Sequence, residues 1–500
     1  MLNRASGVLL PVFSLPSKYG IGTFGKDAYK FVRYLEKMGM TYWQMLPLNP
    51  TSFGDSPYQS FSAFALNPYF IDLEMLKKDG YLQKEDLKPL NHRYQRSIDY
   101  GELYNKRFDI LRKAYALAKD DYKEEIGKFA KRNAYWVKDY ALFMVIKDLN
   151  KGQSWLSWED DYRLRKKKAL AQVSEEHKED IDFWIFLQFI AHQQYVKLRK
   201  YAHRHHVKII GDIPIYVAMD SADVWANPGL FQLDRDRRPV KVSGVPPDYF
   251  SKTGQLWGNP LYDYEAMEKH HFLWWKRRVK NCAGLFDVLR IDHFRGMEAY
   301  WAVPYGETTA VNGEWIKGPG MKLVNAIKEA GGKKLDVIAE DLGLLTPEVM
   351  KLKEESGWPG LAVYEFAFDP NDPNYTSSYY PENYKENVVA YLGTHDNDTV
   401  MHFLKTAEPI RLKPFIFHYL GDVKDDESAA KEMIRRMLVS KADTVIFMIQ
   451  DLFLENEARI NTPGTSGNNW QYRLDKDYFN TTLAERIRDL VVASRRYGNK

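Results

Sequence analysis

The chain has 500 residues, 45% of them hydrophobic and 28% charged, and its formal net charge is only +4 at pH 7. This length allows one large core with insertions, and the near balance of charge gives no reason to expect nucleic acid or acidic lipid as the main partner. Cys282 is the only cysteine, which excludes a disulfide framework, and the lack of a signal-peptide pattern or an apolar stretch of roughly 18 residues predicts a cytoplasmic protein without membrane spans.

The N-terminal region predicts a parallel strand–helix–strand unit. Residues 7–13 form an apolar strand pattern, and a glycine-rich turn follows them. Apolar residues within 28–35 then recur at helical spacing, and Gly39 is a plausible helix end. Residues 41–46 form a second strand pattern that stops at Pro47. This order of elements is typical of a parallel sheet.

The next part of the chain predicts an insertion. Residues 48–70 are irregular, polar and aromatic, and residues from about 85 to 180 are highly charged with helical apolar stripes. A long amphipathic helix at 183–206 is expected to return the chain to the core. We therefore assign residues 48–182 to a largely helical insertion after the second strand.

Six further strand patterns follow, some of them separated by helical patterns. With the first two they make eight buried strands, which predicts an α/β protein whose fold is a (β/α)8 TIM barrel with helical and irregular insertions between barrel strands. We expect residues 1–500 to form one catalytic barrel chain, with a second insertion at 217–284 that carries a substrate-covering loop after the third strand. The six patterns are residues 207–212, 286–292, 336–341, 361–366, 387–396 and 444–451.

Acidic residues stand at the ends of several of these strands. The C-terminal ends of barrel strands meet at one face, where packing carboxylates together is unfavourable unless they are paired or protonated. Taken alone, Arg290 and Asp292 are explained equally well by a structural ion pair. The repetition of the pattern favours a catalytic cluster. The acidic residues are Asp212, Asp292, Glu340, Asp341, Asp396 and Asp451.

Two carboxylates with unequal pKa values are what glycosidic bond cleavage requires. Asp292 is the natural ionised member, because Arg290 lies two residues away on the same strand face. Glu340 follows an apolar run, so burial and the like charge of Asp341 are expected to raise its pKa and suit it to general acid/base catalysis. For a retaining reaction the two carboxyl groups should lie about 5–5.5 Å apart. We expect Asp341 itself to be a helix N-cap.

Four segments then resemble the signature regions of the α-amylase clan, and more narrowly those of the amylomaltases, which are 4-α-glucanotransferases or disproportionating enzymes. The resemblance runs from about Ser6 to about Trp470. The clan's first region ends in Asn-His, but Tyr216 and Val217 stand there in this chain, as in amylomaltases. The four segments are residues 211–216, 289–293, 339–343 and 393–398, and further matches lie at 56–58, 244–250, 254–260 and 459–465.

The resemblance implies a role for each matching residue. Asp292 is expected to be the nucleophile and Glu340 the acid/base, while Asp396 stabilises the transition state through the sugar 2- and 3-hydroxyls. The implied reaction is retaining transfer of α-1,4-glucan segments between maltooligosaccharides, which are both donor and acceptor. Arg290 and His395 assist. The remaining implied substrate-binding residues are Tyr58, Asp212, Asp248, Trp257 and Asn461.

Other interpretations remain open at this point. A hydrolase of the same clan uses the same carboxylates, and a non-catalytic glucan-binding barrel is a third possibility that the intact acidic set disfavours. Tyr58 and Trp257 are also explained by ordinary packing, and His395 by a core histidine. The sequence does not reveal the oligomeric state.

We expect the chemistry to need no metal and no other cofactor. Calcium requires a dedicated cluster of oxygen ligands, and the position at which the clan usually has a calcium-linked Asn is Tyr216. The sequence also lacks the phosphate-binding loop that would accompany Mg²⁺. Prolonged treatment with EDTA is therefore expected to leave activity unchanged. A loss of activity that added metal restores would contradict this prediction.

Residues 243–257 are predicted to favour transfer over hydrolysis. Closing loops can shield a reactive intermediate from water. Here Gly244 and Gly254 are expected to act as flexible points, and Tyr249 and Phe250 as apolar cover. The alternative is a surface loop with incidental aromatic residues.

Overall fold

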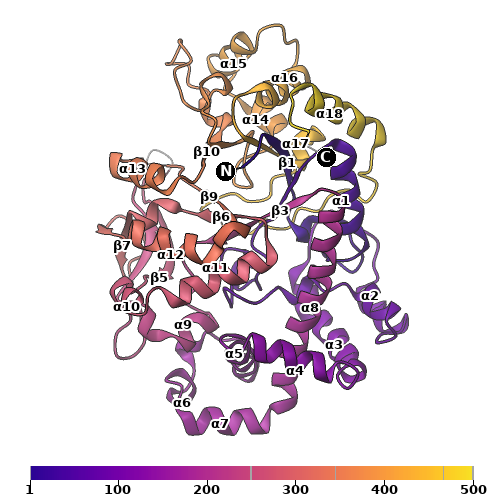
Figure 1. Ribbon diagram of the computed structural model, residues 1–500, viewed down its shortest axis with the longest axis vertical. Coiled ribbons are helices and arrows are strands. Elements are labelled where there is room, and N and C mark those ends of the chain that lie inside the picture. Colours follow the sequence, from indigo (N-terminus) through magenta and orange to yellow (C-terminus); the bar gives the residue numbers. More distant parts are fainter. Residues whose placement is uncertain (1, 248–250, 344, 466, 498–500) are drawn as a thin grey trace.

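The computed structural model describes residues 2–247, 251–343, 345–465 and 467–497. Its centre is an eight-stranded parallel sheet in the order β10-β11-β12-β1-β2-β3-β6-β9. The predicted α/β fold, a (β/α)8 barrel, is confirmed (Figure 1). Each of the eight predicted strand patterns supplies one strand. The strands are β1 (Ala5–Leu9), β2 (Tyr42–Gln44), β3 (Lys208–Pro214), β6 (Val288–Asp292), β9 (Asp336–Ala339), β10 (Gly360–Val363), β11 (Val388–Tyr391) and β12 (Thr444–Met448).

The sheet is nearly closed between β9 and β10. There the backbone N–H of Ala339 donates to the carbonyl oxygen of Pro359 at 2.9 Å. Except for β3, the strands are shorter than the sequence patterns, and at several of them polar residues at the C-terminal end leave the ladder for turns or short helices. Glu365, for example, lies in a 3-10 turn after β10, and Asp451 lies in α17 (Ile449–Leu452) after β12.

One glycine makes room for the packing beneath the site. A Cβ atom added to Gly211 in β3 would lie 2.2 Å from the ring of Phe286. Only a residue without a side chain fits this close approach. Gly211 thereby lets β3 and its next residue, Asp212, continue beside β6.

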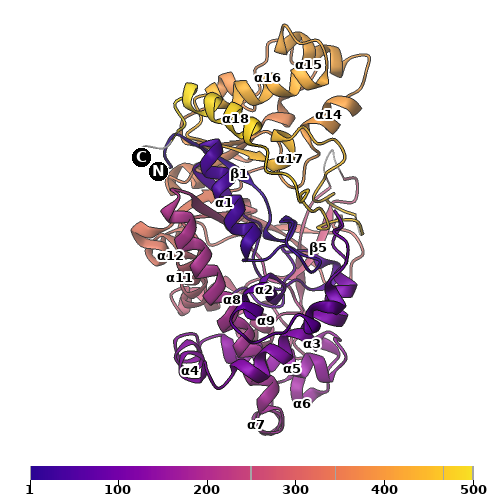
Figure 2. The ribbon, with the colours of Figure 1, turned by 90° about the vertical axis from the view of Figure 1, so that its right-hand side faces the viewer.

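Helices surround the barrel (Figures 1 and 2). The predicted N-terminal helix is α1, which ends at Gly39 with φ +74°, the left-handed conformation expected of a C-terminal glycine. The predicted long return helix is α8. Apart from those between β2 and α8, the α-helices of the described residues are α1 (Lys26–Met38), α8 (Lys178–Arg204), α9 (Ala222–Ala226), α10 (Tyr264–Lys269), α11 (Leu273–Leu285), α12 (Met321–Gly331), α13 (Pro347–Ser356), α14 (Val400–Thr406), α15 (Leu412–Leu420), α16 (Asp426–Val439), α17 and α18 (Thr481–Ala493).

The segment between β2 and α8 is helical after an irregular start. Helices α3 to α7 gather at the end of the molecule that lies away from α14, α15 and α16 in both views (Figures 1 and 2). The helices of this segment are α2 (Leu73–Lys78), α3 (Tyr100–Ala118), α4 (Lys123–Arg132), α5 (Val137–Leu149), α6 (Asp160–Arg163) and α7 (Lys167–Glu176).

A second sheet, which the sequence did not predict, lies beside the barrel. Its four antiparallel strands have the order β5-β4-β7-β8, and they are β4 (Lys241–Val245), β5 (Gln255–Pro260), β7 (Ala299–Pro304) and β8 (Glu314–Lys317). It therefore joins parts of the chain that precede and follow the barrel strand β6. Because β4 and β7 pair across a stretch of sequence that contains β6, no local sequence pattern predicts this sheet.

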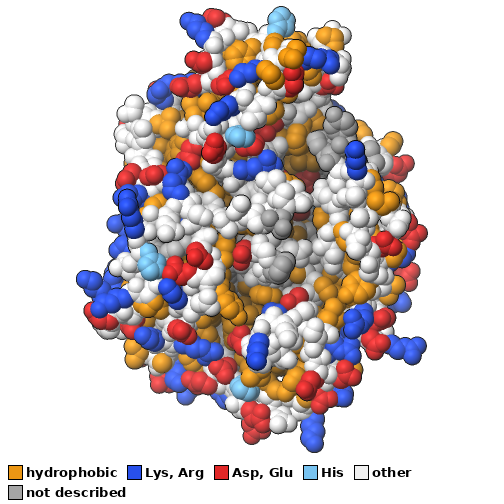
Figure 3. All heavy atoms as spheres, turned by 180° about the vertical axis from the view of Figure 1, so that it is seen from behind, with side chains coloured by type: hydrophobic (Ala, Val, Ile, Leu, Met, Phe, Trp, Pro, Cys, Tyr) orange, Lys and Arg blue, Asp and Glu red, His pale blue; other side chains and the backbone are white. Residues whose placement is uncertain are grey.

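Basic and acidic side chains are interspersed over the face opposite to that of Figure 1 (Figure 3). Among the described residues, no helix combines the length and the hydrophobicity of a membrane span.

Candidate active site

Arg290 holds two carboxylates together at the C-terminal ends of β3 and β6. Its Nη1 donates to both carboxylate oxygens of Asp212 at 2.8 and 2.7 Å, and its Nη2 donates to Asp292 Oδ1 at 2.8 Å. The strand register explains the first pair, since it places Asp212 directly beside Arg290. Burial acts to lower the pKa of Arg290, but the charges of Asp212 and Asp292 outweigh it and raise the pKa. The guanidinium therefore stays charged.

Asp292 and Glu340 are brought together by the pairing of β6 with β9. The register places Ile291 beside Ala339, so that Asp292 and Glu340 follow at the same level of neighbouring strands. Neighbouring strands lie about 4.7–4.9 Å apart. The backbone N–H of Glu340 donates to the Ile291 carbonyl oxygen at 3.1 Å, which continues the ladder. The Asp292 side chain is 30% exposed, so it remains accessible to a bound molecule.

The Glu340 carboxyl group is buried and held by two backbone donors. The N–H of His293 donates to its Oε2 at 2.7 Å, and the N–H of Leu342 donates to its Oε1 at 2.8 Å. His293 has φ +54°, an unusual left-handed conformation for a residue that is not glycine. Burial and then the charge of Asp292 raise the pKa of Glu340 to about 7. The predicted elevation of this pKa is thus found.

The like charge that raises this pKa is not the predicted one. Asp341 turns away from Glu340, and its carboxylate accepts from the backbone N–H of Leu361 at 2.7 Å and from Lys353 Nζ at 2.6 Å. Its prediction as a helix N-cap is wrong, because Thr346 caps the following helix, α13. Asp341 instead joins β9 to the start of β10, where a buried carboxylate needs both a donor and a counter-charge.

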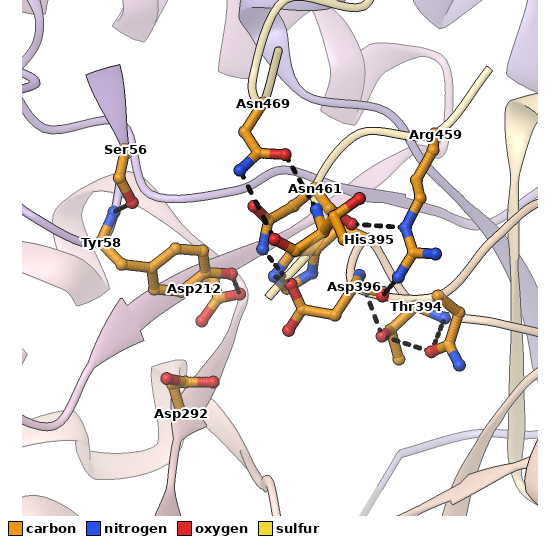
Figure 4. A network of polar contacts seen from close by, with 12 residues as sticks. Ser56, Tyr58, Asp212, Asp292, Thr394, His395, Asp396, Arg459, Asn461 and Asn469 are labelled. Carbon is orange, nitrogen blue, oxygen red and sulfur yellow. Dashed lines mark hydrogen bonds and ion pairs between the residues drawn. The ribbon is translucent and has the colours of Figure 1, made fainter. Parts of the chain in front are cut away.

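Tyr58 and His395 cover the Asp212 side of the cluster (Figure 4). The Tyr58 hydroxyl donates to Asp212 Oδ2 at 2.8 Å. The two rings of Tyr58 and His395 are stacked, with centroids 5.3 Å apart and planes 13° apart. Both side chains therefore belong to the polar cluster, and ordinary packing does not explain the hydroxyl of Tyr58.

Asp396 follows β11 and faces the same space as Asp292 and Asp212 (Figure 4). The Nδ2 atom of Asn461 donates to Asp396 Oδ1 at 2.6 Å. His395 Nε2 lies 3.4 Å from the same oxygen, and 45% of the Asp396 side chain is exposed. The structure thus brings Asp396, His395 and Asn461 together with the Arg290 cluster.

Asp451 does not join this cluster. Its Oδ1 accepts from the backbone N–H of Val400 at 2.8 Å, within the packing around α14. Burial raises its pKa to about 7. The acidic residues at the ends of β3, β6, β9 and β11 therefore lie in the cluster, whereas the acidic residue after β12 does not.

Trp257 lies in β5 of the second sheet, against His293, the residue that follows Asp292. Its ring stands edge-on to the His293 ring, with centroids 4.7 Å apart. The side chain is partly buried, so one aromatic face near the site is only partly covered. Through His293, whose N–H also binds Glu340, the second sheet is linked to the carboxyl groups.

The described ends of the predicted covering segment lie in two paired antiparallel strands, β4 and β5. Gly244 lies in β4, and a Cβ atom added to it would lie 2.6 Å from the Gln255 carbonyl oxygen. Gly254 has φ +67°, and its added Cβ would lie 2.3 Å from the Val245 carbonyl oxygen. Glycine at these two positions permits close backbone approach, and their role as flexible points stays a prediction. The predicted roles of Asp248, Tyr249 and Phe250 fall outside the described residues.

Three neighbours of the cluster were not singled out from the sequence. They are His293, Arg459 and Trp470, whose ring lies 5.9 Å from that of Tyr58 and 6.0 Å from that of His395. His293 directly follows Asp292, and Arg459 begins the segment 459–465, so both stood inside matching motifs. Trp470 offered no such signal, because only the folded chain brings it to the site.

Among the described residues, no group of three or more His, Cys, Asp or Glu is placed to hold a metal ion, and the metal-free reaction stays a prediction.

Comparison with known proteins assigns the chain to a family. A family model described as 4-alpha-glucanotransferase matches residues 10–478. The chain belongs to this 4-alpha-glucanotransferase family. Membership makes it an enzyme, and the resemblance to amylomaltases drawn from the motifs is confirmed.

Relatives of this 4-alpha-glucanotransferase family member match over nearly their whole length. The chain is 49% identical over 481 residues to the 4-alpha-glucanotransferase of Clostridium butyricum, covering 95% of this chain and 97% of that protein. It is 43% identical over 501 residues to the 4-alpha-glucanotransferase of Streptococcus pneumoniae, covering 99% and 98%. The solved amylomaltase of Streptococcus agalactiae in complex with acarbose superposes with a TM-score of 0.94 at 36% identity, covering 99% of this chain and 100% of that one.

Proposed function

We propose that the protein transfers α-1,4-glucan segments between maltooligosaccharides by a retaining double displacement through a covalent glycosyl-enzyme. One observation carries this proposal. Asp292, bound by the Arg290 guanidinium at 2.8 Å, lies beside Glu340, whose pKa is raised to about 7. One carboxyl group is thus paired with a cation while its neighbour can hold a proton near neutral pH, which suits the division of roles that glycosidic cleavage needs.

In the first step, a carboxylate oxygen of Asp292 attacks C1 of the donor sugar as the glycosidic bond breaks. Glu340 gives its proton to the departing oxygen, and the shortened glucan leaves with a free 4-hydroxyl group. The product is an ester between C1 and Asp292. Arg290 stays paired with Asp212, and this pairing keeps the guanidinium in place while the Asp292 charge is consumed.

In the second step, the 4-hydroxyl of an acceptor glucan attacks C1 from the side that the leaving group vacated. The Glu340 carboxylate takes the proton of that hydroxyl, and the bond from C1 to Asp292 breaks. Two displacements at C1 restore the α configuration. Both carboxyl groups end in their starting protonation states.

The other clustered side chains are assigned to sugar binding. We place Asp396 at the 2- and 3-hydroxyls of the reacting sugar, with His395 beside it. Tyr58 gives an aromatic face and holds Asp212 through its hydroxyl. Trp257 and Asp248 are proposed to line the glucan path, as is Asn461. The Streptococcus agalactiae amylomaltase binds acarbose, and we expect acarbose to bind in the same cluster here.

The pKa of Glu340 predicts loss of activity on the alkaline side. The protonated form is the acid of the first step, so its contribution is present below pH 7 and lost as the pH rises through about 7. Well above that pH, kcat/KM for a maltooligosaccharide donor should fall about tenfold per pH unit. A glycosyl fluoride donor, whose leaving group needs no proton, should lack this limb. The same limb with both donors would assign it to another group.

Incubation with maltotriose tests the proposed reaction directly. Transfer predicts glucose together with a ladder of longer oligomers, because the glycosyl-enzyme is passed to a sugar. Separation of the products distinguishes this from the nearest alternative, a hydrolase, which would release only glucose and maltose. Water is present at about 55 M, so transfer requires an oriented acceptor, and orientation can contribute several kcal/mol. Unchanged maltotriose would contradict both enzymatic functions.

A further inference from the structure

Arg459 ties together the two segments that carry Asp396 and Asn461 (Figure 4). Its Nη2 donates to the carbonyl oxygen of Asp396 at 2.6 Å, and its Nε donates to the carbonyl oxygen of Asn461 at 2.8 Å. Its Nη1 lies 3.3 Å from Asp398 Oδ2. The guanidinium therefore bridges the loop after β11 and the segment after α17, with a hydrogen bond to each.

The same two segments are joined by a second set of bonds. The Asn461 Nδ2 donates to the Asp396 carboxylate at 2.6 Å, and the Asn461 N–H donates to the His395 carbonyl oxygen at 3.1 Å. Asp396 is thus fixed at its main chain by Arg459 and at its side chain by Asn461. Because Arg459 also binds the Asn461 carbonyl, moving the guanidinium would release the main-chain attachment of Asp396 and one of the bonds that place Asn461.

The planar guanidinium suits this role better than an ammonium group. Its donors form a rigid fork, so several acceptors can be bound in fixed directions at once. Lysine carries the same charge at a single point on a flexible chain. A substitution by lysine therefore keeps the charge near Asp398 but loses the simultaneous hold on two carbonyl oxygens.

We propose that Arg459 is a positioning residue that acts through Asp396, holding its carboxylate at the 2- and 3-hydroxyls of the reacting sugar. This inference rests on the proposed function, which gives Asp396 that role. Arg459 is not assigned a contact with the substrate. Its contribution lies in fixing the peptide and the side chain of Asp396 before the sugar arrives, so that this alignment need not be gained during the reaction.

The first test compares Arg459→Lys with a matched variant, Arg199→Lys. Arg199 also donates to two carbonyl oxygens, those of Gly284 and Phe286, and to the carboxylate of Asp287, but at the opposite end of β6. Misplacement of a group near the chemistry can cost on the order of 100-fold in rate. We expect Arg459→Lys to lower kcat by about 10- to 100-fold with KM changed less than about threefold. Arg199→Lys should lower the melting temperature while leaving kcat near that of the wild type.

The second measurement separates positioning from loss of folded enzyme. Each variant is assayed with α-maltosyl fluoride and with its analogue that lacks the 2-hydroxyl on the fluorine-bearing ring. The ratio of the two rates does not depend on the folded fraction. Without one of the two hydroxyls that Asp396 is proposed to bind, Arg459→Lys should lose at least about fivefold less activity than with the complete donor, because one of the misaligned contacts is already absent.

A third variant, Asp398→Asn, isolates the ion pair. It removes the counter-charge of Arg459 but leaves the bonds to the two carbonyl oxygens, so kcat should fall less than about threefold. The proposal is overturned if Arg459→Lys keeps wild-type kcat, or if it loses activity equally with both fluoride donors. Wild-type enzyme that cleaves neither fluoride would instead contradict the proposed function.

Discussion

Replacing Asp292 by asparagine is expected to abolish turnover of every donor, including glycosyl fluorides. The amide has nearly the same size, and Arg290 can still donate to its oxygen, so the fold and the binding of glucan should persist. The attacking anion is lost, however, and no neighbouring carboxylate can replace it, because Asp212 is held by both the Arg290 guanidinium and the Tyr58 hydroxyl. We expect kcat to fall by at least about 10³-fold.

Asp287, just before β6, offers a matched control for Asp292→Asn. Asp287 precedes β6 and accepts from Arg199 Nη2 at 2.7 Å and from the Ile209 N–H at 2.8 Å. Asp287→Asn is expected to reduce the melting temperature and to leave kcat largely unchanged, since it stands at the opposite end of β6. Mass spectrometry adds a direct measurement, because wild-type enzyme quenched during turnover should carry a glucan mass on Asp292. Donor cleavage by Asp292→Asn at more than a few per cent of the wild-type rate would contradict the assignment.

Replacing Glu340 by glutamine should separate the two chemical steps. With maltooligosaccharides, whose leaving group needs a proton, we expect a fall of about 10²- to 10⁴-fold in kcat/KM, the usual contribution of a general acid. With a glycosyl fluoride the first step should survive, and the glycosyl-enzyme should accumulate, because no base remains to activate the acceptor. A burst of fluoride followed by slow turnover would report this state.

The environment of Glu340 makes it necessary to check that the glutamine side chain keeps its position. Both carboxyl oxygens accept from backbone N–H groups, those of His293 and Leu342, so the amide of glutamine must turn its NH2 group toward one donor. Its position is therefore checked by the affinity for acarbose and by the melting temperature. Asp341→Asn, at the adjacent buried position, should lower the melting temperature but not kcat, since Asp341 binds Lys353 and the Leu361 N–H. Loss of the fluoride burst in Glu340→Gln, with binding retained, would contradict the acid/base assignment.

The sequence determined the barrel and the main members of the cluster. Apolar strand runs with polar ends are local features, and each of the eight runs forms a strand. Two residues on one strand face are neighbours by geometry alone, so the pairing of Arg290 with Asp292 followed from their spacing. The elevated pKa of Glu340 followed from the apolar run before it, because burial is its largest cause.

The tertiary structure decided which charges meet. Glu340 is adjacent to Asp341 in the sequence, yet the negative charge that raises its pKa is that of Asp292. The reason is that β6 lies beside β9, while the Asp341 carboxylate is paired with Lys353. The second sheet, the position of Trp470 and the hold of Arg459 on Asp396 likewise depend on segments that are distant in sequence. Electrostatic and hydrogen-bond energies depend on distance in space, and sequence separation sets that distance only within one strand or one turn.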